Sequence, residues 1–415
     1  FHHFFVVGGW RSMKVVVLGA GYAGVTAVMR LVRSKFPGEV VLVNDGPHHQ
    51  LTTQMHRVAA GAVEPAAVLL SIDTLLRWTP ARLVQGKATA IDPERRLVQL
   101  EDGRELDYDR LVVALGSRIE TFGVPGVLEH ALTVQPVQEA LRTRRHLTAR
   151  LHDAAFWDGE ERRASLRFVI VGGGLTGVEV AGELADRLPA EARGLGMDPS
   201  ELEIVIIEAG RRLLPGLDER IAMRAGQILA RKHVAVWTET PVTEVVEPPS
   251  PYDDAPAGVR VAEGRFVPAR TVIWAAGVRA HELVERTFAS GERGRALVDE
   301  YLRARDYPDV YIVGDSAYAV PQDRGQAAAP TAQNAVHQAE VAARNLLAEA
   351  AAAEGKGAPP RLVPYTARDR GVLVSVGVGE AVGELSVGEF WRPRLSGFSA
   401  YAFKWAAEQR YKLGL

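Results

Sequence analysis

The chain has 415 residues, of which 47% are hydrophobic and 24% are charged, the balance of a folded globular protein with room for two or three domains. Its formal net charge of -2 gives no indication of a nucleic acid partner. Cysteine is absent, which excludes disulfides, thiolate metal sites, iron–sulfur clusters and dithiol relays. Any redox chemistry must therefore run on a bound organic cofactor, and we expect no metal site.

No run of the sequence reaches the roughly 18 consecutive apolar residues that a membrane-spanning helix needs. Residues 1–12 contain paired histidines and a Gly-Gly pair, and they lack the cleavage site of a signal peptide. A strand pattern opens only at Met13. We expect residues 1–12 to be tag or upstream residues that lie outside the fold.

Two strand–helix–strand patterns organise the chain. The first runs from a strand at 15–18 through a helix to a strand at 40–43. The second runs from a strand at 168–171 through a helix at 175–187 to a strand at 204–207. Such units build doubly wound parallel sheets, so we predict an α/β protein with two Rossmann-like dinucleotide-binding domains.

The first unit joins its strand to its helix through Gly-Ala-Gly-Tyr-Ala-Gly at 19–24. Its glycines permit a tight turn, and the free amides at the start of the helix attract a pyrophosphate. Between a strand and a helix, this motif favours dinucleotide binding over a purely structural turn. The residues expected at the nucleotide are Gly19, Gly21 and Gly24 in the turn, with Asn44 and Asp45 at the ribose position after the next strand.

The second unit has Gly-Gly-Gly-Leu-Thr-Gly at 172–177, again between a strand and a helix. The next strand ends at Glu208, and a carboxylate at that place pairs with ribose hydroxyls and repels a 2′-phosphate. Arg211 and Arg212 follow closely and could accept such a phosphate. The carboxylate favours NADH over NADPH as the second nucleotide.

A third motif is Gly314-Asp315, which comes directly after a short apolar strand at 310–313. A carboxylate there can reach the polyol hydroxyls of a ligand that lies across the strand ends. Gly-Asp alone is also an ordinary turn, so this motif gains its meaning from the two glycine turns.

The remaining segments have weaker signals. Residues 151–166 and 188–201 are polar and rich in proline or charge, and we expect surface connections there. An alanine-rich helix is predicted over 331–354. A β-rich segment is predicted from Val363, and a last helix from about Ser396.

The two glycine turns, Ala-Leu-Gly-Ser at 114–117, Ala-Ala-Gly at 275–277 and Gly-Asp at 314–315 together resemble the two-dinucleotide-domain flavoproteins. In that family the first fold holds FAD, the second fold is inserted in the first and holds NAD(P)H, and the Gly-Asp carboxylate binds the flavin ribityl chain. The resemblance runs from about Met13 to Leu347.

This resemblance implies a discontinuous FAD-binding domain over 13–130 and 295–355 and an NADH-binding domain over 131–294. A C-terminal domain on the membrane and quinone side is expected over 361–415. It would combine a β-rich segment with an amphipathic helix.

Within that group the chain resembles the type II NADH:quinone oxidoreductases. The segment at 48–56 is similar to the family's flavin-wrapping segment, and Gly-Leu-Thr-Gly-Val-Glu at 174–179 is similar to its nicotinamide-side motif. The resemblance implies flavin contacts from Thr52, Thr53, Ala114, Gly116, Asp315, Ala332 and Gln333. It implies NADH contacts from Gly172, Gly174, Thr176, Gly177, Glu179, Glu208, Ala276 and Gly277.

Ala-Gln-Asn-Ala-Val-His at 332–337 resembles the family's quinone motif, Ala-Gln-x-Ala-x-Gln, with His337 in place of the second glutamine. Gln333 and His337 lie four residues apart and so share a helix face, which would also suit two polar groups facing solvent. A histidine can hydrogen-bond a quinone carbonyl and deliver a proton. With the resemblance, we expect both side chains to bind the quinone.

Glu179 follows the last glycine of the second turn by two residues. A carboxylate in the first turn of a helix stabilises the helix dipole in any protein. The resemblance implies that Glu179 faces the flavin–nicotinamide region. We expect it to handle protons or position a ligand, without a part in hydride transfer.

Aromatic and basic residues gather near the C-terminus. Phe398, Tyr401 and Trp405 recur at helical spacing, while Lys404 and Arg410 are basic. This pattern suits a membrane interface as well as a helix docked on the protein body. The resemblance favours the membrane, so we expect peripheral attachment through this helix at the cytoplasmic face of the cell membrane.

These features together predict an NADH:quinone oxidoreductase that passes hydride from NADH to FAD and two electrons to a membrane quinone, without proton pumping and with a homodimer allowed. A soluble ferredoxin- or rubredoxin-type NAD(P)H-dependent reductase is one alternative, and it would need a charged docking patch and no amphipathic tail. A non-enzymatic NADH-binding redox sensor is another, and it would turn over slowly with every quinone. The lack of cysteine excludes a sulfide:quinone reductase.

Overall fold

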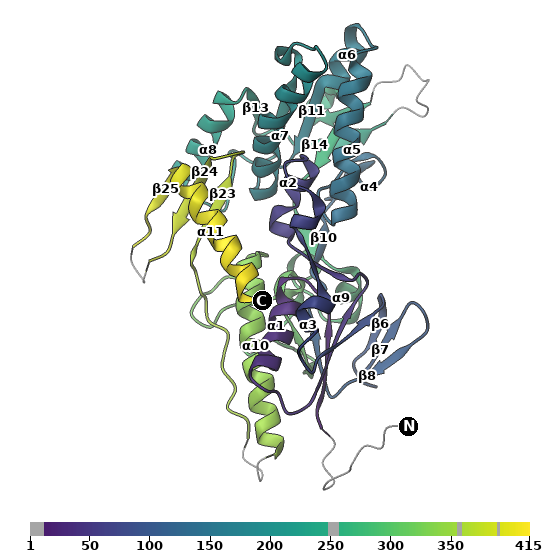
Figure 1. Cartoon of the computed structure of the whole chain (residues 1–415), viewed down its shortest axis with the longest axis vertical. Helices are drawn as coiled ribbons and strands as arrows, with labels where there is room; N and C mark the ends of the chain where they lie inside the picture. Colours follow the sequence, from purple (N-terminus) through teal and green to yellow (C-terminus); the bar gives the residue numbers. More distant parts are fainter. Residues whose placement is uncertain (1–11, 248–256, 355–358, 388–390) are drawn as a thin grey trace.

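The structure is a computed structural model that describes residues 12–247, 257–354, 359–387 and 391–415. Two α/β lobes are stacked along the long axis of the molecule, with the C-terminal strands and helix beside their junction (Figure 1). The prediction for residues 1–12 lies outside the described residues, apart from the last of them. Every helix of the described part is too short or too polar to span a bilayer.

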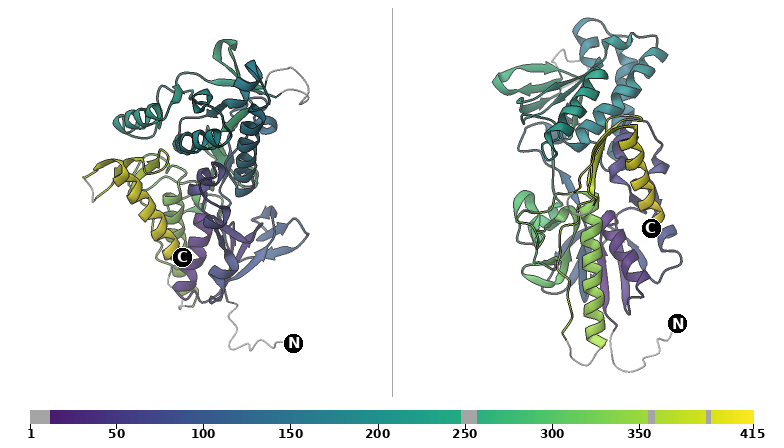
Figure 2. Two further views of the ribbon diagram at one scale, coloured as in Figure 1. Left: turned by 45° about the horizontal axis from the view of Figure 1, so that its top comes forward. Right: turned by 90° about the vertical axis from the view of Figure 1, so that its left-hand side faces the viewer.

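The first lobe is built on a six-stranded sheet in the order β20-β21-β9-β1-β2-β5, which is parallel except for the edge strand β20. Its strands are β1 (Lys14–Leu18), β2 (Glu39–Asn44), β5 (Arg82–Gln85), β9 (Arg110–Val113), β20 (Arg303–Ala304) and β21 (Tyr307–Ile312). Helices α1 (Tyr22–Arg33) and α10 (Ala332–Glu354) pack against each other beside it (Figure 2). Chain segments from before and after the second lobe thus share one sheet.

The second lobe is built on a four-stranded parallel sheet in the order β13-β12-β11-β17. Its strands are β11 (Arg167–Val171), β12 (Glu203–Ile207), β13 (Val234–Trp237) and β17 (Thr271–Trp274). The helices packed against them are α5 (Val137–Ala154), α7 (Leu175–Gly194) and α8 (Glu219–Arg231). The predicted α/β architecture with two Rossmann-like units is confirmed.

Almost continuous apolar runs in the sequence explain why the strands of both sheets are buried. β1 reads Lys-Val-Val-Val-Leu and β11 reads Arg-Phe-Val-Ile-Val, and every residue after the first of each strand is buried. Parallel strands that are covered on both faces have this composition instead of an alternating one. Ligands bind such sheets outside the carboxyl ends of the strands, which is where both glycine turns lie.

Antiparallel elements complete the fold. Two three-stranded sheets decorate the lobes: β6 (Ala88–Asp92), β7 (Leu97–Leu100) and β8 (Glu105–Asp107), and β14 (Val242–Val246), β15 (Gly258–Val261) and β16 (Phe266–Pro268). β10 (Ser117–Ile119) pairs with β18 (Val278–Ala280). The C-terminal unit has β23 (Gly371–Ser375), β24 (Ala381–Leu385), β25 (Arg394–Gly397) and α11 (Phe398–Gly414). Shorter elements are α2 (Met55–Ala59), α3 (Ile72–Leu76), α4 (Val127–His130), α6 (Gly159–Leu166), α9 (Glu282–Thr287), β3 (His48–Gln50), β4 (Leu69–Ser71), β19 (Ala296–Leu297) and β22 (Ala317–Tyr318).

Two predicted surface connections were wrong. The region 151–166 contains the end of α5 and all of α6, and α7 continues through Pro189 to Gly194 instead of ending near residue 187. A helix that buries only a narrow stripe has a mostly polar sequence, so composition alone did not reveal it. The predicted alanine-rich helix and the C-terminal β-rich segment with its last helix are confirmed.

Candidate functional site

The first glycine turn lies between β1 and α1, and its outer glycines have no room for a side chain. Gly19 has a φ of 94°, and a Cβ on it would lie 2.4 Å from the Ala114 carbonyl oxygen. A Cβ on Gly24 would lie 1.8 Å from the Gly19 carbonyl oxygen. Only glycine therefore lets β1, β9 and α1 approach this closely.

The second glycine turn, between β11 and α7, repeats this geometry. Gly172 has a φ of 106°, and a Cβ on it would lie 2.5 Å from the Cα of Ala276. A Cβ on Gly177 would lie 1.9 Å from the Gly172 carbonyl oxygen. The structure thus brings Ala114 and Ala276, both predicted site residues, against the first glycine of their own turn.

The middle glycines differ from the outer ones. A Cβ on Gly21 or Gly174 would meet no atom within 4 Å. Each of the two is the N-cap of its helix, and no side chain caps the free amides there. Each turn therefore presents uncapped helix amides to open space, the arrangement that a pyrophosphate fits.

The residues predicted at the ribose positions hold the turns. The Asn44 side-chain oxygen accepts a hydrogen bond from the Ala20 amide at 2.9 Å, while Asp45 beside it is exposed. The Glu208 carboxylate accepts from the amides of Gly173 and Gly210, each at 2.6 Å. Both acceptors thus sit at the carboxyl end of the second strand of their unit.

Asp315 lies three residues after the end of β21 and is partly buried, and desolvation raises the pKa of its carboxyl group. Its Oδ2 atom accepts a hydrogen bond from the Ser117 hydroxyl at 2.8 Å. The neighbouring Ser316 donates to the Gly116 carbonyl at 3.1 Å, so β10 and the Gly-Asp turn are tied together. Thr53, on the segment after β3, hydrogen-bonds the Tyr22 hydroxyl at 2.8 Å. Thr53 therefore lies against α1, and a Cβ on Gly314 would lie 3.4 Å from the Cβ of Ala23 on the same helix.

The predicted quinone pair lies at the start of α10 and faces the segment 365–370. Gln333 Nε2 donates to the Arg368 carbonyl at 2.8 Å, and His337 Nε2 lies 3.1 Å from the Thr366 carbonyl. His337 Nδ1 is buried without a hydrogen-bond partner. Burial lowers the pKa of the His337 imidazole, so the neutral ring donates through Nε2 to Thr366.

Glu179 lies beyond the first turn of α7, which contains no acidic residue, so its predicted place in the first turn was wrong. It is buried instead in a polar cluster, which we call the Glu179 cluster and which consists of Glu179, Lys404, Ser375 and His56. The Lys404 ammonium forms an ion pair with Glu179 Oε1 and lies 3.2 Å from the Ser375 hydroxyl. His56 Nδ1 lies 3.5 Å from Glu179 Oε2.

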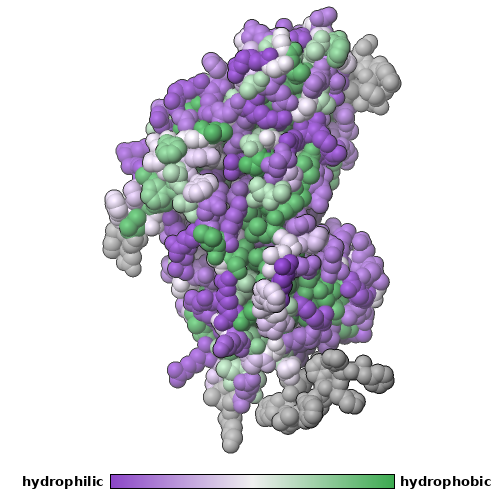
Figure 3. All heavy atoms as spheres, viewed as in Figure 1, coloured by the Kyte–Doolittle hydropathy of each residue, from purple (hydrophilic) through white to green (hydrophobic). Residues whose placement is uncertain are grey.

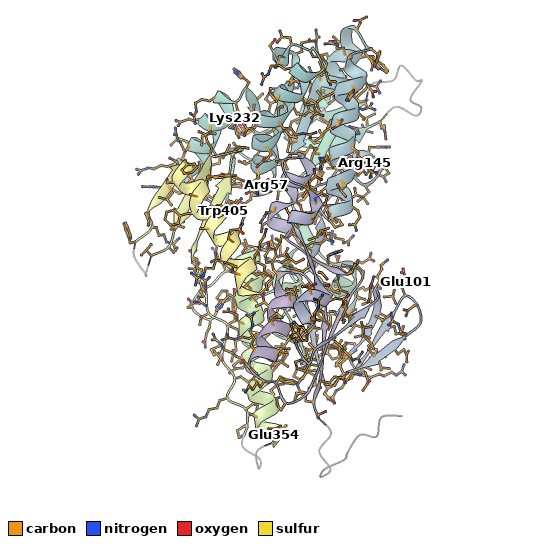
Figure 4. The ribbon with its side chains drawn as sticks, in the orientation of Figure 1. Arg57, Glu101, Arg145, Lys232, Glu354 and Trp405 are labelled. Atoms are coloured by element: carbon orange, nitrogen blue, oxygen red, sulfur yellow. The ribbon has the colours of Figure 1, made fainter. Side chains whose placement is uncertain are left out.

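The Glu179 cluster joins four elements: α2, α7, β23 and α11. Figure 4 labels Arg57 on α2 and Trp405 on α11, which are next to His56 and Lys404 in the chain. Burial opposes ionisation of Glu179, but Lys404 and His56 hold the pKa of its carboxyl below the usual value. Burial lowers the pKa of His56 to about 4, so its imidazole is neutral near pH 7.

Lys404 was expected to face a membrane, and the structure turns it inward. The inner face of α11 consists of Ala400, Lys404, Glu408 and Tyr411, and their helical spacing was the signal that sequence reasoning missed. The Tyr411 ring lies 4.7 Å from the Tyr22 ring, and its hydroxyl is 3.1 Å from His49 Nε2. α11 therefore touches both glycine-turn helices, α1 through Tyr411 and α7 through Lys404.

The outer face of α11 is largely apolar, although the charged Arg410 is exposed on it as well. Its exposed side chains include Phe398 (74% exposed), Phe403 (53%), Trp405 (55%) and Leu413 (88%). Hydrophobic side chains reach the surface around this helix in Figure 3. An amphipathic helix docked on a protein normally turns its apolar face inward, so α11 has the opposite orientation to a helix that only covers the body.

Comparison with known proteins agrees with this geometry. A family model for pyridine nucleotide-disulphide oxidoreductases matches residues 13–339. The type II NADH:quinone oxidoreductase of Staphylococcus saprophyticus is 31% identical over 373 residues, and that of Staphylococcus aureus is 32% identical over 375; each match covers 89% of both chains. Among solved structures, NDH2 of Plasmodium falciparum in complex with NADH superposes with a TM-score of 0.81 at 20% identity, covering 97% of this chain and 95% of that one. The sulfide:quinone oxidoreductase of Aquifex aeolicus has the same fold, with a TM-score of 0.75 at 19% identity over 96% of this chain and 90% of that one.

Proposed function

Because the chain belongs to the type II NADH:quinone oxidoreductases, we propose that it oxidises NADH and reduces a membrane quinone through bound FAD, without proton pumping. The observation that carries this proposal is the pair of uncapped glycine turns, one on each lobe, with the Glu179 cluster between them. Bound FAD supplies the chemistry, since it accepts a hydride and can release an electron pair.

The first turn fits FAD and the second fits NADH. Space over Gly21 and the free amides of α1 suit the FAD pyrophosphate, and Asp315 is placed to accept hydrogen bonds from a polyol chain. At the second turn the Glu208 carboxylate suits ribose hydroxyls and repels a 2′-phosphate, which favours NADH. Thr176 and Gly277 belong to the same NADH site.

Quinone reduction consumes two protons, and Glu179 is the group we assign to proton handling. Lys404 and Ser375 hold its carboxylate on one side, and neutral His56 lies on the other. These partners keep the Glu179 carboxylate ionised, so it can accept a proton or a hydrogen bond at the site. Hydride transfer itself needs orientation rather than a protein acid or base.

Gln333 and His337 have different parts in the quinone site. The Gln333 amide has a second N–H left for a quinone carbonyl after it donates to Arg368. The single N–H of neutral His337 is used on the Thr366 carbonyl, so its assigned part is to hold the segment 365–370 as a wall of the site.

The enzyme attaches to the membrane through the outer face of α11, at the cytoplasmic side where NADH is available. Phe403→Glu with Trp405→Glu should reduce co-sedimentation with anionic lipid vesicles about tenfold, since two apolar contacts with the bilayer are lost. Phe156→Glu is the matched control, because Phe156 is 89% exposed on the second lobe. Equal loss in the control, or none in the double variant, would argue against this surface.

The outer face of α11 also argues against a ferredoxin-type reductase as the alternative function. A ferredoxin-type reductase would present a charged docking patch there, and the exposed side chains of this helix are mainly aromatic and aliphatic. A redox sensor without an acceptor would turn over slowly with every quinone.

NADH oxidation with a short-chain quinone tests the acceptor site. Gln333→Ala should raise the quinone KM about tenfold, because it removes the free amide donor. His337→Gln keeps an N–H for Thr366 and should stay near wild type, whereas His337→Leu should raise the quinone KM. Asn334→Ala is the control, since that side chain faces the Ala329 carbonyl. Unchanged quinone kinetics in Gln333→Ala and His337→Leu would reject this acceptor site and leave the FAD assignment standing.

A further inference from the structure

A small cavity of about 140 Å³ lies beside the Gly-Asp turn, and the partly buried Asp315 is part of its wall. Three arginines line the same cavity: Arg279, Arg293 and Arg295. The other charged residue in the wall is Glu292. Each arginine is thus a potential charge partner for Asp315.

Two of the three arginines are engaged elsewhere or reach solvent. Arg279 on β18 forms ion pairs with Glu285 and Glu120. The Arg293 side chain is 42% exposed, and its guanidinium lies 5.6 Å from the Phe122 ring centre. Neither is an unshielded charge directed at the cavity.

Arg295 is different, because its side chain is buried and its ion pair with Glu292 is long. Its Nη1 donates to the Ala328 carbonyl at 2.9 Å, and its guanidinium lies 4.9 Å from the Tyr318 ring centre. The nearest carboxylate oxygen, on the largely exposed Glu292, is 3.7 Å away. A buried cation with so loose a counterion stabilises an anion nearby.

We propose that Arg295 is a positioning residue for FAD, which keeps Asp315 in the ionised form that the flavin ribityl chain requires. The proposal rests on the FAD site proposed above. An ionised carboxylate is an acceptor only, so both its oxygens can receive hydrogen bonds from polyol hydroxyls. A protonated Asp315 would turn one oxygen into a donor and would lose part of that match.

The positive charge of Arg295 has the sign that favours the ionised form of Asp315. Burial raises the pKa of Asp315, while the Ser117 hydroxyl and the Arg295 charge lower it. If the Arg295 charge is removed, the pKa of Asp315 rises further, so ionisation fails first at the acid end of the working range. FAD affinity should then fall as the pH falls.

Release of FAD from the purified holoprotein on dilution, followed by flavin fluorescence, tests the proposal at pH 6 and pH 9. Arg295→Gln keeps a donor for Ala328 and removes the charge. It should bind FAD several-fold more weakly than wild type at pH 6, because the higher pKa leaves part of Asp315 protonated, and within about twofold of wild type at pH 9. Arg295→Lys keeps the charge and should show no such pH dependence, and Arg293→Gln should behave as wild type.

A second experiment separates action through Asp315 from general damage. In an Asp315→Asn background, Arg295→Gln should add no further loss, because there is no carboxylate left to ionise. An equal loss at both pH values, an additive loss in the double variant, or the same pH dependence in Arg295→Lys would overturn the proposal. Wild-type protein without flavin at either pH would instead contradict the FAD site itself.

Discussion

The two glycine turns have the same backbone but different surroundings. Gly19 and Gly172 both have a left-handed φ, and Gly24 and Gly177 both touch the carbonyl of that first glycine. The residue after the middle glycine differs: Tyr22 lies under Tyr411 of α11, whereas Leu175 is 38% exposed. The backbone of each turn thus suits a pyrophosphate, and the side chains that follow the middle glycine distinguish the two sites.

The two turns also differ in the side chain that accepts a hydrogen bond from the turn at the end of the second strand. The first turn is held by the neutral amide of Asn44, and the second by the carboxylate of Glu208. A carboxylate repels a 2′-phosphate and an amide does not. The first turn, with its amide acceptor and Tyr22 packed against Tyr411, suits FAD, and the second turn, with its carboxylate, suits NADH.

Loss of an outer glycine should have the largest effect on activity and should break the two sites separately. Gly24→Ala puts a Cβ against the Gly19 carbonyl, and we expect colourless protein destabilised by about 1–3 kcal/mol or more. Gly177→Ala has the same clash at the second turn, so it should retain FAD but lose NADH oxidation. Visible spectra measure the bound FAD of each variant, and denaturant unfolding measures its stability.

The middle glycines provide the controls for this pair. Gly21→Ala and Gly174→Ala meet no protein atom, so each should fold normally and lose affinity only for its own nucleotide. If Gly177→Ala released FAD and Gly24→Ala did not, the assignment of the turns would have to be reversed.

Lys404→Met should destabilise the protein by about 3–5 kcal/mol, because it leaves the buried Glu179 carboxylate without its cation. Glu179→Gln combined with Lys404→Met should cost much less, since both charges are gone. The pKa of Glu179 is depressed, so its stabilisation is present above the usual carboxyl pKa and is lost as the pH falls through the lower, folded value. Urea unfolding at several acid pH values should therefore show a steeper loss in wild type than in the double variant.

Exchanging the acceptors at the strand ends sharpens the difference between the turns. Glu208→Gln should raise the NADH KM about tenfold and affect the NADPH KM less, because the repulsion of a 2′-phosphate is lost. Asn44→Asp is the reciprocal change at the first turn and should leave the NADH KM unchanged. A Glu208→Gln enzyme with an unaltered preference for NADH would show that the carboxylate does not select the nucleotide.

Loss of the Tyr411 ring, which packs against Tyr22 at the first turn, should have the smallest effect. Tyr411→Ala removes the ring beside Tyr22 and the contact with His49, so FAD should leave about three- to tenfold faster, as expected for an aromatic contact of about 0.5–1.5 kcal/mol. Leu175→Ala, at the equivalent place in the second turn, should not change FAD release. Flavin fluorescence after dilution compares the two rates.

The sequence predicted the glycine turns well because their requirement is local. A positive φ and a close carbonyl select glycine at Gly19 and Gly172, so residue type alone reveals the geometry. The strands that precede the turns are continuous apolar runs and were equally recognisable. Asp315 followed from the same pattern of a strand that ends in a glycine.

The Glu179 cluster could not be predicted in this way. Glu179 and Lys404 are 225 residues apart, and only the folded chain brings α7 and α11 together. Lys404 was interpreted with its aromatic neighbours, although its inward face depends on what lies under the helix. The same long-range dependence hid Arg295, which becomes meaningful only beside Asp315.

The most direct measurement of the assignment of both turns is an anaerobic titration of the purified protein with NADH, followed by visible absorbance and then by addition of a short-chain quinone. A resident FAD on the first turn and an exchanging NADH on the second predict yellow protein that NADH bleaches and quinone restores. Colourless protein, or a yellow colour that NADH leaves unchanged, would contradict the assignment.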